Sequence, residues 1–216
     1  MKRLLDILIS TITLIIFSPV FLIIIIVLKL SGEGEVFYLQ KRIGHYNRPF
    51  KIWKFATMVK NSPNLLTGDV TLKEDPRVLP VGKLLRITKL NELPQIINVL
   101  KGDMSIVGAR PIMQPSFDVY SDAAKKIIYN TPPGITGIAS LIFRDEESLI
   151  ENANMDPMEF YRNQIIPYKN ELDIWYQQNR SFMIDIKIIF LTAWAILFSS
   201  SDLIEKCFKN LPSKTF

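Results

Sequence analysis

The sequence is poor in the two side chains that most often carry metal sites and redox chemistry. Cys207 is the only cysteine among 216 residues, and His45 is the only histidine. An internal disulfide is therefore excluded, and a reducing compartment fits the composition. A zinc site rich in histidine cannot be built, and a Ser-His-Asp triad would have to use His45. Carboxylates, arginines and lysines remain as the candidate groups for chemistry.

Acidic residues are absent from Val36–Lys60, where basic and aromatic side chains alternate. Together with a net charge of +5, this stretch predicts an anionic partner. A membrane surface and a single-stranded nucleic acid would both suit it. The apolar segment directly upstream favours membrane lipids, and no nucleic-acid-binding module is recognisable, so we expect no nucleic-acid partner. Core packing of the aromatics in a β-hairpin is a compatible alternative, because VFYLQ and FKIWKF have strand character.

Charge is also missing from residues 7–28, which are almost wholly apolar. A helix of this length is about 33 Å long and could cross a bilayer. Pro19 interrupts the run, and positive charges flank both of its ends, which disfavours placing either end outside. We therefore expect a helix that enters the membrane, kinks at Ser18–Pro19 and returns to the same face. The Ser18 hydroxyl could bond a carbonyl freed at the kink. A spanning helix is the alternative.

The stretch 84–111 combines a short helix with conspicuous charges. Apolar residues recur at helical spacing from Leu93 to Leu100, which predicts a helix that Asn91 would cap and Gly102 would end. The free N–H groups at such a helix start favour an anion, and Glu92, Arg86 and Arg110 would surround a bound phosphate.

The loop after this helix has a glycine and an arginine close together. Gly108 is expected to allow an unusual backbone angle, and Arg110 to grip a phosphate in a bidentate way. A surface salt bridge is the alternative for Arg110. The other expected elements are a loop over 61–80, a helix over 116–130, a rigid turn over 131–137, a helix over 156–178 that Pro167 breaks, and an apolar helix over 182–199, either interfacial or buried.

Taken together, these features resemble the bacterial sugar transferases that start glycan assembly on a polyprenyl phosphate, also called monotopic phosphoglycosyl transferases, in their small single-domain type. The resemblance runs over most of the chain. The family usually has an Asp-Glu pair where this chain has Asn91–Glu92, an arginine at Ala56 and a proline at Ala109. The motifs that carry it are KRLLDI, Ser18–Pro19, VFYLQKRIG, FKIWKFATM, Asp75–Arg77, LLRITKLNELPQIINVLKGDMSIVGARP, Pro133–Gly137 and NRSFMIDIKII.

The resemblance implies a mostly helical α/β fold. Residues 1–30 would form a re-entrant membrane helix. Residues 31–205 would form the phosphoglycosyl transferase domain, a compact catalytic core with a small β-hairpin and amphipathic interfacial helices, and residues 206–216 would form a tail. The chain would lie at the bacterial inner membrane, with the catalytic domain on the cytoplasmic face.

The resemblance also implies a reaction. A UDP-sugar would give its sugar-1-phosphate to polyprenyl phosphate, yielding a polyprenyl-diphosphate-sugar and UMP, as the first membrane step of exopolysaccharide, capsule or O-antigen synthesis. Mg²⁺ would assist, with Glu92 as its ligand. The implied site comprises Asn91 and Glu92 as catalytic residues, Arg77, Arg86 and Arg110 as phosphate-binding residues, and Lys54 and Asp185 as further active-site candidates.

Asn91 stands where the family has its nucleophile. In the family this aspartate attacks the β-phosphate of the donor and forms an acyl-phosphate. A carboxamide oxygen is neutral and is a weaker nucleophile and Mg²⁺ ligand than a carboxylate. Glu92 or another carboxylate could do the work, or the chain could be an engineered inactive form. A silent membrane scaffold of a glycan assembly complex is the alternative function.

Overall fold

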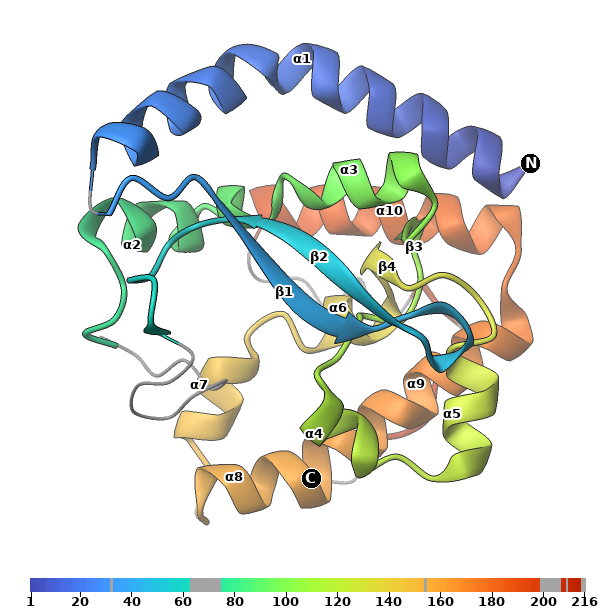
Figure 1. Cartoon of the computed structure of the whole chain (residues 1–216). Coiled ribbons are helices and arrows are strands. Elements are labelled where there is room, and N and C mark those ends of the chain that lie inside the picture. Colours follow the sequence, from blue (N-terminus) through green and yellow to red (C-terminus); the bar gives the residue numbers. More distant parts are fainter. Residues whose placement is uncertain (32, 63–74, 154, 199–206, 209, 215–216) are drawn as a thin grey trace.

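The computed structural model describes residues 1–31, 33–62, 75–153, 155–198, 207–208 and 210–214. Helices dominate this part of the chain, and its strands form two-stranded sheets (Figure 1). The expected mostly helical α/β class is therefore confirmed. Most of the expected loop over 61–80 and the expected boundary at 205–206 lie outside the described residues. The elements are α1 (Lys2–Leu30), β1 (Phe37–Ile43), η1 (His45–Asn47), β2 (Pro49–Phe55), α2 (Pro80–Ile87), η3 (Leu90–Glu92), α3 (Gln95–Lys101), β3 (Ser105–Val107), α4 (Gln114–Asp118), α5 (Asp122–Ile128), β4 (Gly134–Thr136), α6 (Ile138–Ile142), α7 (Glu146–Glu151), α8 (Pro157–Phe160), η4 (Tyr161–Ile165), α9 (Ile166–Asn179) and α10 (Phe182–Leu197).

The longest element is α1, a single apolar helix that arches over the domain (Figure 1). Pro19 lies inside it and has no N–H to donate to the carbonyl of Ile15, four residues earlier. The Ser18 hydroxyl donates to that carbonyl instead, at 2.8 Å, as the sequence predicts. Within the described residues, α1 is the one helix long and apolar enough to cross a membrane.

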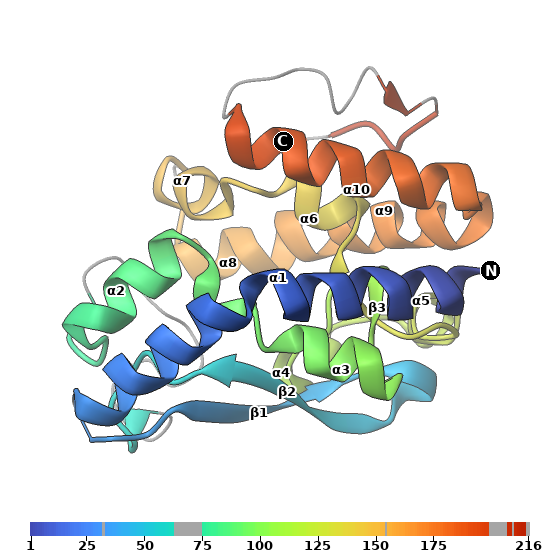
Figure 2. The same cartoon turned by 90° about the horizontal axis from the view of Figure 1, so that it is seen from above.

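Both ends of α1 are fixed to the same domain. Near its start, Asp6 is 4% exposed and accepts hydrogen bonds from the Ser105 hydroxyl at 3.0 Å and the Ile106 N–H at 2.9 Å. Near its end, Leu28 is buried in a cluster with Phe55. From above, α1 runs between α10 and the β1–β2 hairpin (Figure 2). A helix held at both ends in this way is not a stalk that leads away from the domain.

The outward face of α1 is apolar and uncovered. A soluble domain rarely leaves so many large apolar side chains in water, so this face marks an interaction surface. The neighbouring helices α2 and α10 expose further apolar side chains. The exposed residues are Leu4, Ile7, Leu8, Ile12, Ile15, Ile16, Phe17, Leu22, Ile23, Ile26, Val27 and Leu30 on α1, Leu84 and Ile87 on α2, and Phe182, Met183, Ile186, Phe190 and Ile196 on α10.

The expected hairpin is present, with β1 and β2 paired antiparallel along their whole length. Its aromatic side chains belong partly to the core. Phe55 is 1% exposed, and its ring stacks on Phe37 with 5.5 Å between the centroids. Tyr38 differs, because it is 38% exposed. Core packing, the alternative considered for these aromatics, thus holds at Phe55.

A buried asparagine joins the hairpin to α3. Asn98 is fully buried, and its side-chain oxygen accepts the Trp53 N–H at 2.9 Å. Its amide nitrogen donates to the Lys51 carbonyl at 2.8 Å. The side chain therefore completes the hydrogen bonds of β2 as a neighbouring strand would, and it fixes β2 relative to α3.

The second sheet pairs β3 with β4 in parallel, a pairing that the sequence analysis did not foresee. Glycines make it possible, since a Cβ on Gly108 would lie 2.8 Å from the Gly134 nitrogen, and one on Gly137 would collide with the Gly108 carbonyl. The expectation of an unusual angle at Gly108 is wrong, because its φ is not positive. Gly108 is needed for close approach of two backbones, which positions the loop that carries Arg110.

Two expected helices are interrupted. The region 116–130 contains α4 and α5, and Ser121 between them caps α5 by accepting the Ala124 N–H at 3.2 Å. The region 156–178 begins with α8 and a π-helical turn, η4, before α9. Pro167 lies in the first turn of α9, where its missing N–H costs little.

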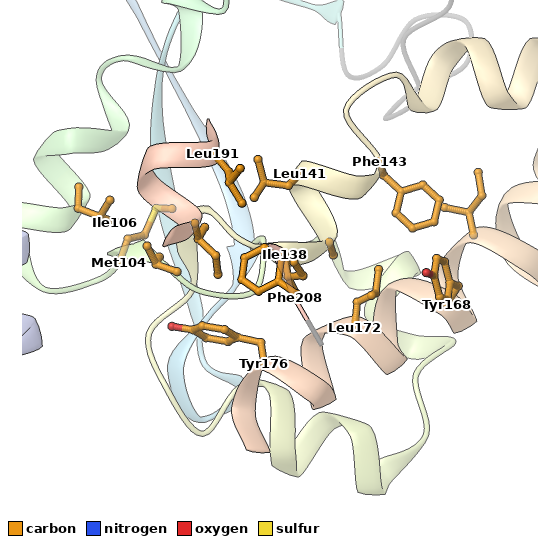
Figure 3. Packing of buried hydrophobic residues seen from close by; sticks show 14 of the residues in the cluster. Met104, Ile106, Ile138, Leu141, Phe143, Tyr168, Leu172, Tyr176, Leu191 and Phe208 are labelled. Carbon is orange, nitrogen blue, oxygen red and sulfur yellow. The ribbon is translucent and has the colours of Figure 1, made fainter. Parts of the chain in front are cut away.

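The main core lies between α3, the second sheet, α6, α9 and α10. Figure 3 shows Leu141, Leu172, Tyr176 and Leu191 among its side chains. Phe208 in the C-terminal segment also belongs to this cluster and is 6% exposed. One side of α10 is therefore core, as the buried alternative predicts, while its other side is uncovered, and the interfacial position of this helix stays a prediction.

Replacing Asn98 with alanine tests its role as the link between β2 and α3. We expect Asn98→Ala to lower the free energy of unfolding by about 1–3 kcal/mol, because the Trp53 N–H and Lys51 carbonyl lose their partner. Urea unfolding of the detergent-solubilised protein measures this. Asn179→Ala is the control, since the Asn179 side chain is exposed and bonds only its own helix; equal losses in the two variants would contradict the proposed link.

Candidate functional site

The site is built on the turn between α2 and α3. Lys89 adopts a left-handed conformation with a φ of 58°, which turns the chain sharply into the 3-10 turn η3. Asn91 is thereby directed inward and is 9% exposed. The expectation that Asn91 caps the helix is wrong, because α3 starts after Pro94, a full turn later. Gly102 ends α3 in a left-handed conformation, as expected.

Glu92 is the carboxylate that two cations share. Arg110 donates from Nη2 to Glu92 Oε1 at 2.6 Å, and Lys54 Nζ lies 3.6 Å from the same oxygen. The Glu92 side chain is 20% exposed and that of Lys54 17%, whereas that of Arg110 is 47% exposed. The guanidinium of Arg110 therefore keeps solvent-accessible donors while it orients Glu92.

The electrostatics hold Glu92 ionised. Burial raises the pKa of its carboxyl, but the charges of Arg110 and Lys54 and the hydrogen bond from Arg110 outweigh burial and bring that pKa to about 2. Glu92 is consequently an anion throughout the physiological range and too weak a base to take up a proton.

The pKa of the Lys54 ammonium is also lowered, which for a base favours the neutral form. Burial lowers the pKa of its ammonium to about 8, opposed by the attraction of Glu92 and assisted by repulsion from Arg42, Arg110 and Arg86. Lys54 is thus mostly protonated at neutral pH and can also release its proton. Arg42 was missed in the sequence analysis, although the hairpin pattern could have placed it on the same strand face as Tyr38, the partner of Lys54.

Asn91 contributes an oxygen without a partner. Its Oδ1 is buried and accepts no hydrogen bond from the described part of the chain, and the amide nitrogen of Gln95, four residues later, likewise has no partner there. Unpaired buried polar atoms are costly and therefore uncommon in folded proteins. Asn91 thus presents an unused acceptor, directly before Glu92 in the chain.

The remaining predicted residues fall into three places. Arg86 is near the centre, where its Nε donates to the Thr57 hydroxyl at 3.0 Å and its charge lowers the pKa of Lys54. Arg77 is 3% exposed and forms a forked ion pair with Asp75, whose oxygens lie 2.6–3.1 Å from its nitrogens. This pair brings the pKa of the Asp75 carboxyl to about 2, chiefly through the hydrogen bond from Arg77.

Asp185 belongs to a different cluster, at the start of α10. Its Oδ2 lies 2.9 Å from Lys2 Nζ, and its Oδ1 accepts the Tyr176 hydroxyl at 2.6 Å. Lys2 also donates to the Val107 carbonyl at 2.9 Å. These contacts tie Asp185 to the first residues of α1 rather than to Glu92. Neither partner was foreseen: Lys2 lies 183 positions from Asp185 in the sequence, and Tyr176 lies nine positions from it on the preceding helix.

The residues at the centre fit a magnesium ion. Among the described residues, no three histidine, cysteine, aspartate or glutamate side chains gather into a ready-made metal site. Mg²⁺, however, is commonly held by one or two protein oxygens together with substrate phosphates. The carboxylate of Glu92 and the unpartnered Oδ1 of Asn91 belong to consecutive residues at the end of η3 and are the oxygens that could serve in this way.

The Glu92–Lys54 pair can be tested by removing the carboxylate charge. In Glu92→Gln we expect the pKa of Lys54 to fall below its present value of about 8, because burial and the arginines remain while the attraction is lost. The pH dependence of acetylation at Lys54, read by peptide mass spectrometry, measures this. Lys60 is the control: it pairs with Glu35 at 2.9 Å and should not respond. A Lys54 pKa that is unchanged or higher in Glu92→Gln than in the parent would contradict the pairing.

Comparisons with known proteins show the family of this chain. The family described as Bacterial sugar transferase matches residues 1–199. The exopolysaccharide production protein ExoY of Sinorhizobium fredii (strain NBRC 101917 / NGR234) is 34% identical over 212 residues, 92% of this chain and 86% of the relative. The uncharacterized sugar transferase EpsL of Bacillus subtilis (strain 168) is 34% identical, covering 92% and 88%. The UDP-glucose:undecaprenyl-phosphate glucose-1-phosphate transferase of Escherichia coli (strain K12) is 36% identical, but the match covers 90% of this chain and 39% of that longer protein. The chain therefore belongs to the bacterial sugar transferase family.

Proposed function

We propose that this protein transfers a sugar-1-phosphate from a UDP-sugar to a polyprenyl phosphate, giving a polyprenyl-diphosphate-sugar and UMP. Family membership supports the reaction class, and longer relatives are named for transfer of glucose-1-phosphate or galactose phosphate to undecaprenyl phosphate. Its product would serve surface glycan synthesis, because the similar ExoY protein is named for exopolysaccharide production.

The observation that carries the proposal is the grouping of cations around Glu92. Two phosphorylated substrates repel each other, so a catalyst has to supply positive charge between them. Arg110 and Lys54 contact Glu92, and the charges of Arg86 and Arg42 are close enough to affect Lys54. Glu92 is the carboxylate that Arg110 and Lys54 contact, and Glu146 attracts Arg110 more weakly, so the cations outnumber the carboxylates and the centre attracts a diphosphate.

Each group at this centre has a role that follows from its charge. Arg110 holds a donor phosphate with the donors it does not use on Glu92. Lys54, with a pKa of about 8, donates a proton to the departing UMP oxygen or stabilises its negative charge. Glu92 and Asn91 would hold Mg²⁺, which supplies positive charge to the phosphate oxygens when bound. Arg77 stiffens the loop near Val59 rather than reaching the donor, since Asp75 and the Ser62 carbonyl occupy its guanidinium.

Residue 91 determines how fast the first step runs. With aspartate at this position, a carboxylate oxygen bonds to the β-phosphorus, the bond from that phosphorus to the bridging oxygen breaks, and UMP leaves with this oxygen. The acceptor phosphate then bonds to the same phosphorus and releases the carboxylate. Asn91 has the same shape without the charge, so we propose that this chain is a slow transferase with its reaction centre intact.

Restoring the carboxylate tests this proposal. We expect Asn91→Asp to raise UMP release from the correct UDP-sugar by at least about tenfold, roughly 1.4 kcal/mol in the barrier. A phosphosugar adduct on residue 91 should accumulate when polyprenyl phosphate is withheld. Luminescent detection of UMP and intact-protein mass spectrometry measure the two effects across a panel of UDP-sugars.

The control for this experiment is Asn163→Asp, which makes the same chemical change at an exposed position. If the parent is fully active and Asn91→Asp adds nothing, the nucleophile is elsewhere, and Glu92→Gln should then abolish activity. If neither chain acts on any donor while both remain folded and membrane-bound, the transferase proposal fails and a silent scaffold of a glycan assembly complex replaces it.

We further propose that α1 is re-entrant and that the domain lies on the cytoplasmic face of the bacterial inner membrane. The anchoring of both ends of α1 to one domain supports this placement, as does its uncovered apolar face. The exposed apolar residues of α2 and α10 would rest in the interface between lipid and water. Polyprenyl phosphate would then approach the centre from the membrane.

Cysteine labelling tests the topology. We place one cysteine before Met1 and another at Lys41, in a Cys207→Ser background. Because both ends of a re-entrant helix lie on the same side, we expect a membrane-impermeant maleimide to label both positions only after the cells are opened. Labelling of one position in intact cells and of the other only in opened cells would establish a spanning helix.

A further inference from the structure

A cavity of about 300 Å³ lies beside the charged centre, between β1 and the start of α4. This is near the lower end of the range of about 300–1,000 Å³ seen for ligand pockets. It mixes one aromatic ring, two cations and two amides with apolar groups. Its walls are formed by Tyr38, Gln40, Lys41, Arg42, Ile43, Met113, Gln114 and Pro115.

The register of the hairpin connects this cavity to the charged centre. Tyr38 is directly opposite Lys54, and directly opposed residues of an antiparallel pair share a face. Gln40 and Arg42 follow at every second position and lie on that same face. The opposite wall begins at Met113, three residues after Arg110. The cavity therefore adjoins the groups proposed to hold the diphosphate.

The polar groups of the cavity are held in place by one another. Gln40 Oε1 accepts hydrogen bonds from Arg42 Nη2 at 2.7 Å and from Nε at 3.1 Å. The amide nitrogen of Gln40 lies 3.4 Å from Met113 Sδ on the facing wall. These contacts link β1 to the α4 segment and present an ordered surface instead of a set of free side chains.

Tyr38 offers a flat apolar surface to a ligand. Its exposed fraction of 38% contrasts with that of Phe55, 1%, which belongs to the core. A partly uncovered ring next to cationic and amide side chains is suited to a nucleobase, since the base can stack on the ring while its polar edge finds donors and acceptors.

We propose that this cavity binds the nucleoside half of the donor, with the uracil stacked on Tyr38 and the diphosphate directed toward Arg110 and Lys54. This assignment rests on the proposed function, which makes a UDP-sugar the donor. Arg42 lies between the two regions, because it lines the cavity and its charge also reaches Lys54. It would contact the α-phosphate, which leaves with UMP.

The position of the cavity favours a water-soluble ligand over the lipid acceptor. In Figure 1 the hairpin lies between α1 and α4, so the α4 wall is on the far side of the hairpin from the apolar helix. A polyprenyl chain would have to leave the apolar face of α1 to reach this wall. A nucleotide, by contrast, meets it from solvent.

Calorimetric titration of the detergent-solubilised full chain tests the assignment, with UMP, uridine and inorganic pyrophosphate as probes. We expect Tyr38→Ala to weaken UMP binding at least tenfold and to remove uridine binding, while pyrophosphate binding stays within twofold of the parent. Tyr38→Phe should retain UMP binding, because it keeps the ring. In turnover, Tyr38→Ala should raise KM for the UDP-sugar and leave kcat nearly unchanged.

A matched control lies on the other face of the same hairpin. Leu39→Ala removes a large side chain next to Tyr38 that does not line the cavity, and it should not weaken UMP binding more than twofold. Arg42→Ala, within the cavity, should weaken UMP binding more than uridine binding.

The proposed subsite is overturned if the parent does not bind UMP, if Tyr38→Ala binds it like the parent, or if UMP and pyrophosphate binding fall together. Its failure can be told apart from failure of the transferase proposal, because UMP release from UDP-sugars is measured separately. Selective loss of uridine and UMP binding in Tyr38→Ala supports the subsite even when no donor is turned over.

Discussion

The side-chain amide of Asn98 replaces a strand that the sheet does not have. It occupies the edge of β2 with one donor and one acceptor, so the hairpin and α3 are joined by two directed bonds as well as by apolar contact. Lys54 lies on β2 and Glu92 just before α3, and their 3.6 Å separation depends on this junction. The close approach of Gly108 to Gly134 supports the third participant, Arg110, from the other side. The charged centre is thus held together by two uncharged features, the side-chain amide of Asn98 and the close approach of Gly108 to Gly134.

Positive charges outnumber negative charges at this centre. Glu92 stays ionised because Arg110 and Lys54 compensate for its burial, and Lys54 is correspondingly easy to deprotonate because burial and several arginines oppose its charge. In this pair Glu92 keeps its negative charge, whereas Lys54 can gain or lose a proton near neutral pH. Glu92 therefore organises the cations, and the protonation state of Lys54 can respond to the charge of a bound ligand.

Much of this arrangement could be predicted from the sequence, and the exceptions have physical reasons. Strong local patterns were reliable: the apolar run of α1, the Ser18 hydrogen bond at Pro19, the hairpin and Gly102 at the end of α3. The wrong predictions concern residues whose conformation is set by contacts with residues distant in the sequence. Asn91 looked like a helix cap because capping is a local rule, whereas the left-handed Lys89 sends it into the interior.

The parallel pairing of β3 and β4 and the link from Lys2 to Asp185 escaped prediction for the same reason. Three-residue strands carry almost no periodic signal, and a salt bridge between residues 2 and 185 leaves no trace in spacing. Resemblance to a family placed Arg110, Glu92 and Lys54 together, and the contacts agree. The resemblance did not predict the buried ion pair between Arg77 and Asp75, because a motif specifies residue types and not their partners.

The hydrogen bond from the Ser18 hydroxyl to the Ile15 carbonyl affects how α1 accommodates its proline. A proline in an apolar helix usually relies on neighbouring helices or trapped water to satisfy the carbonyl it leaves open. Here the residue immediately before the proline closes the gap within the same turn. The carbonyl that Pro19 leaves open is therefore satisfied from within α1, by the residue that directly precedes the proline, and this hydrogen bond does not depend on any other element of the described fold.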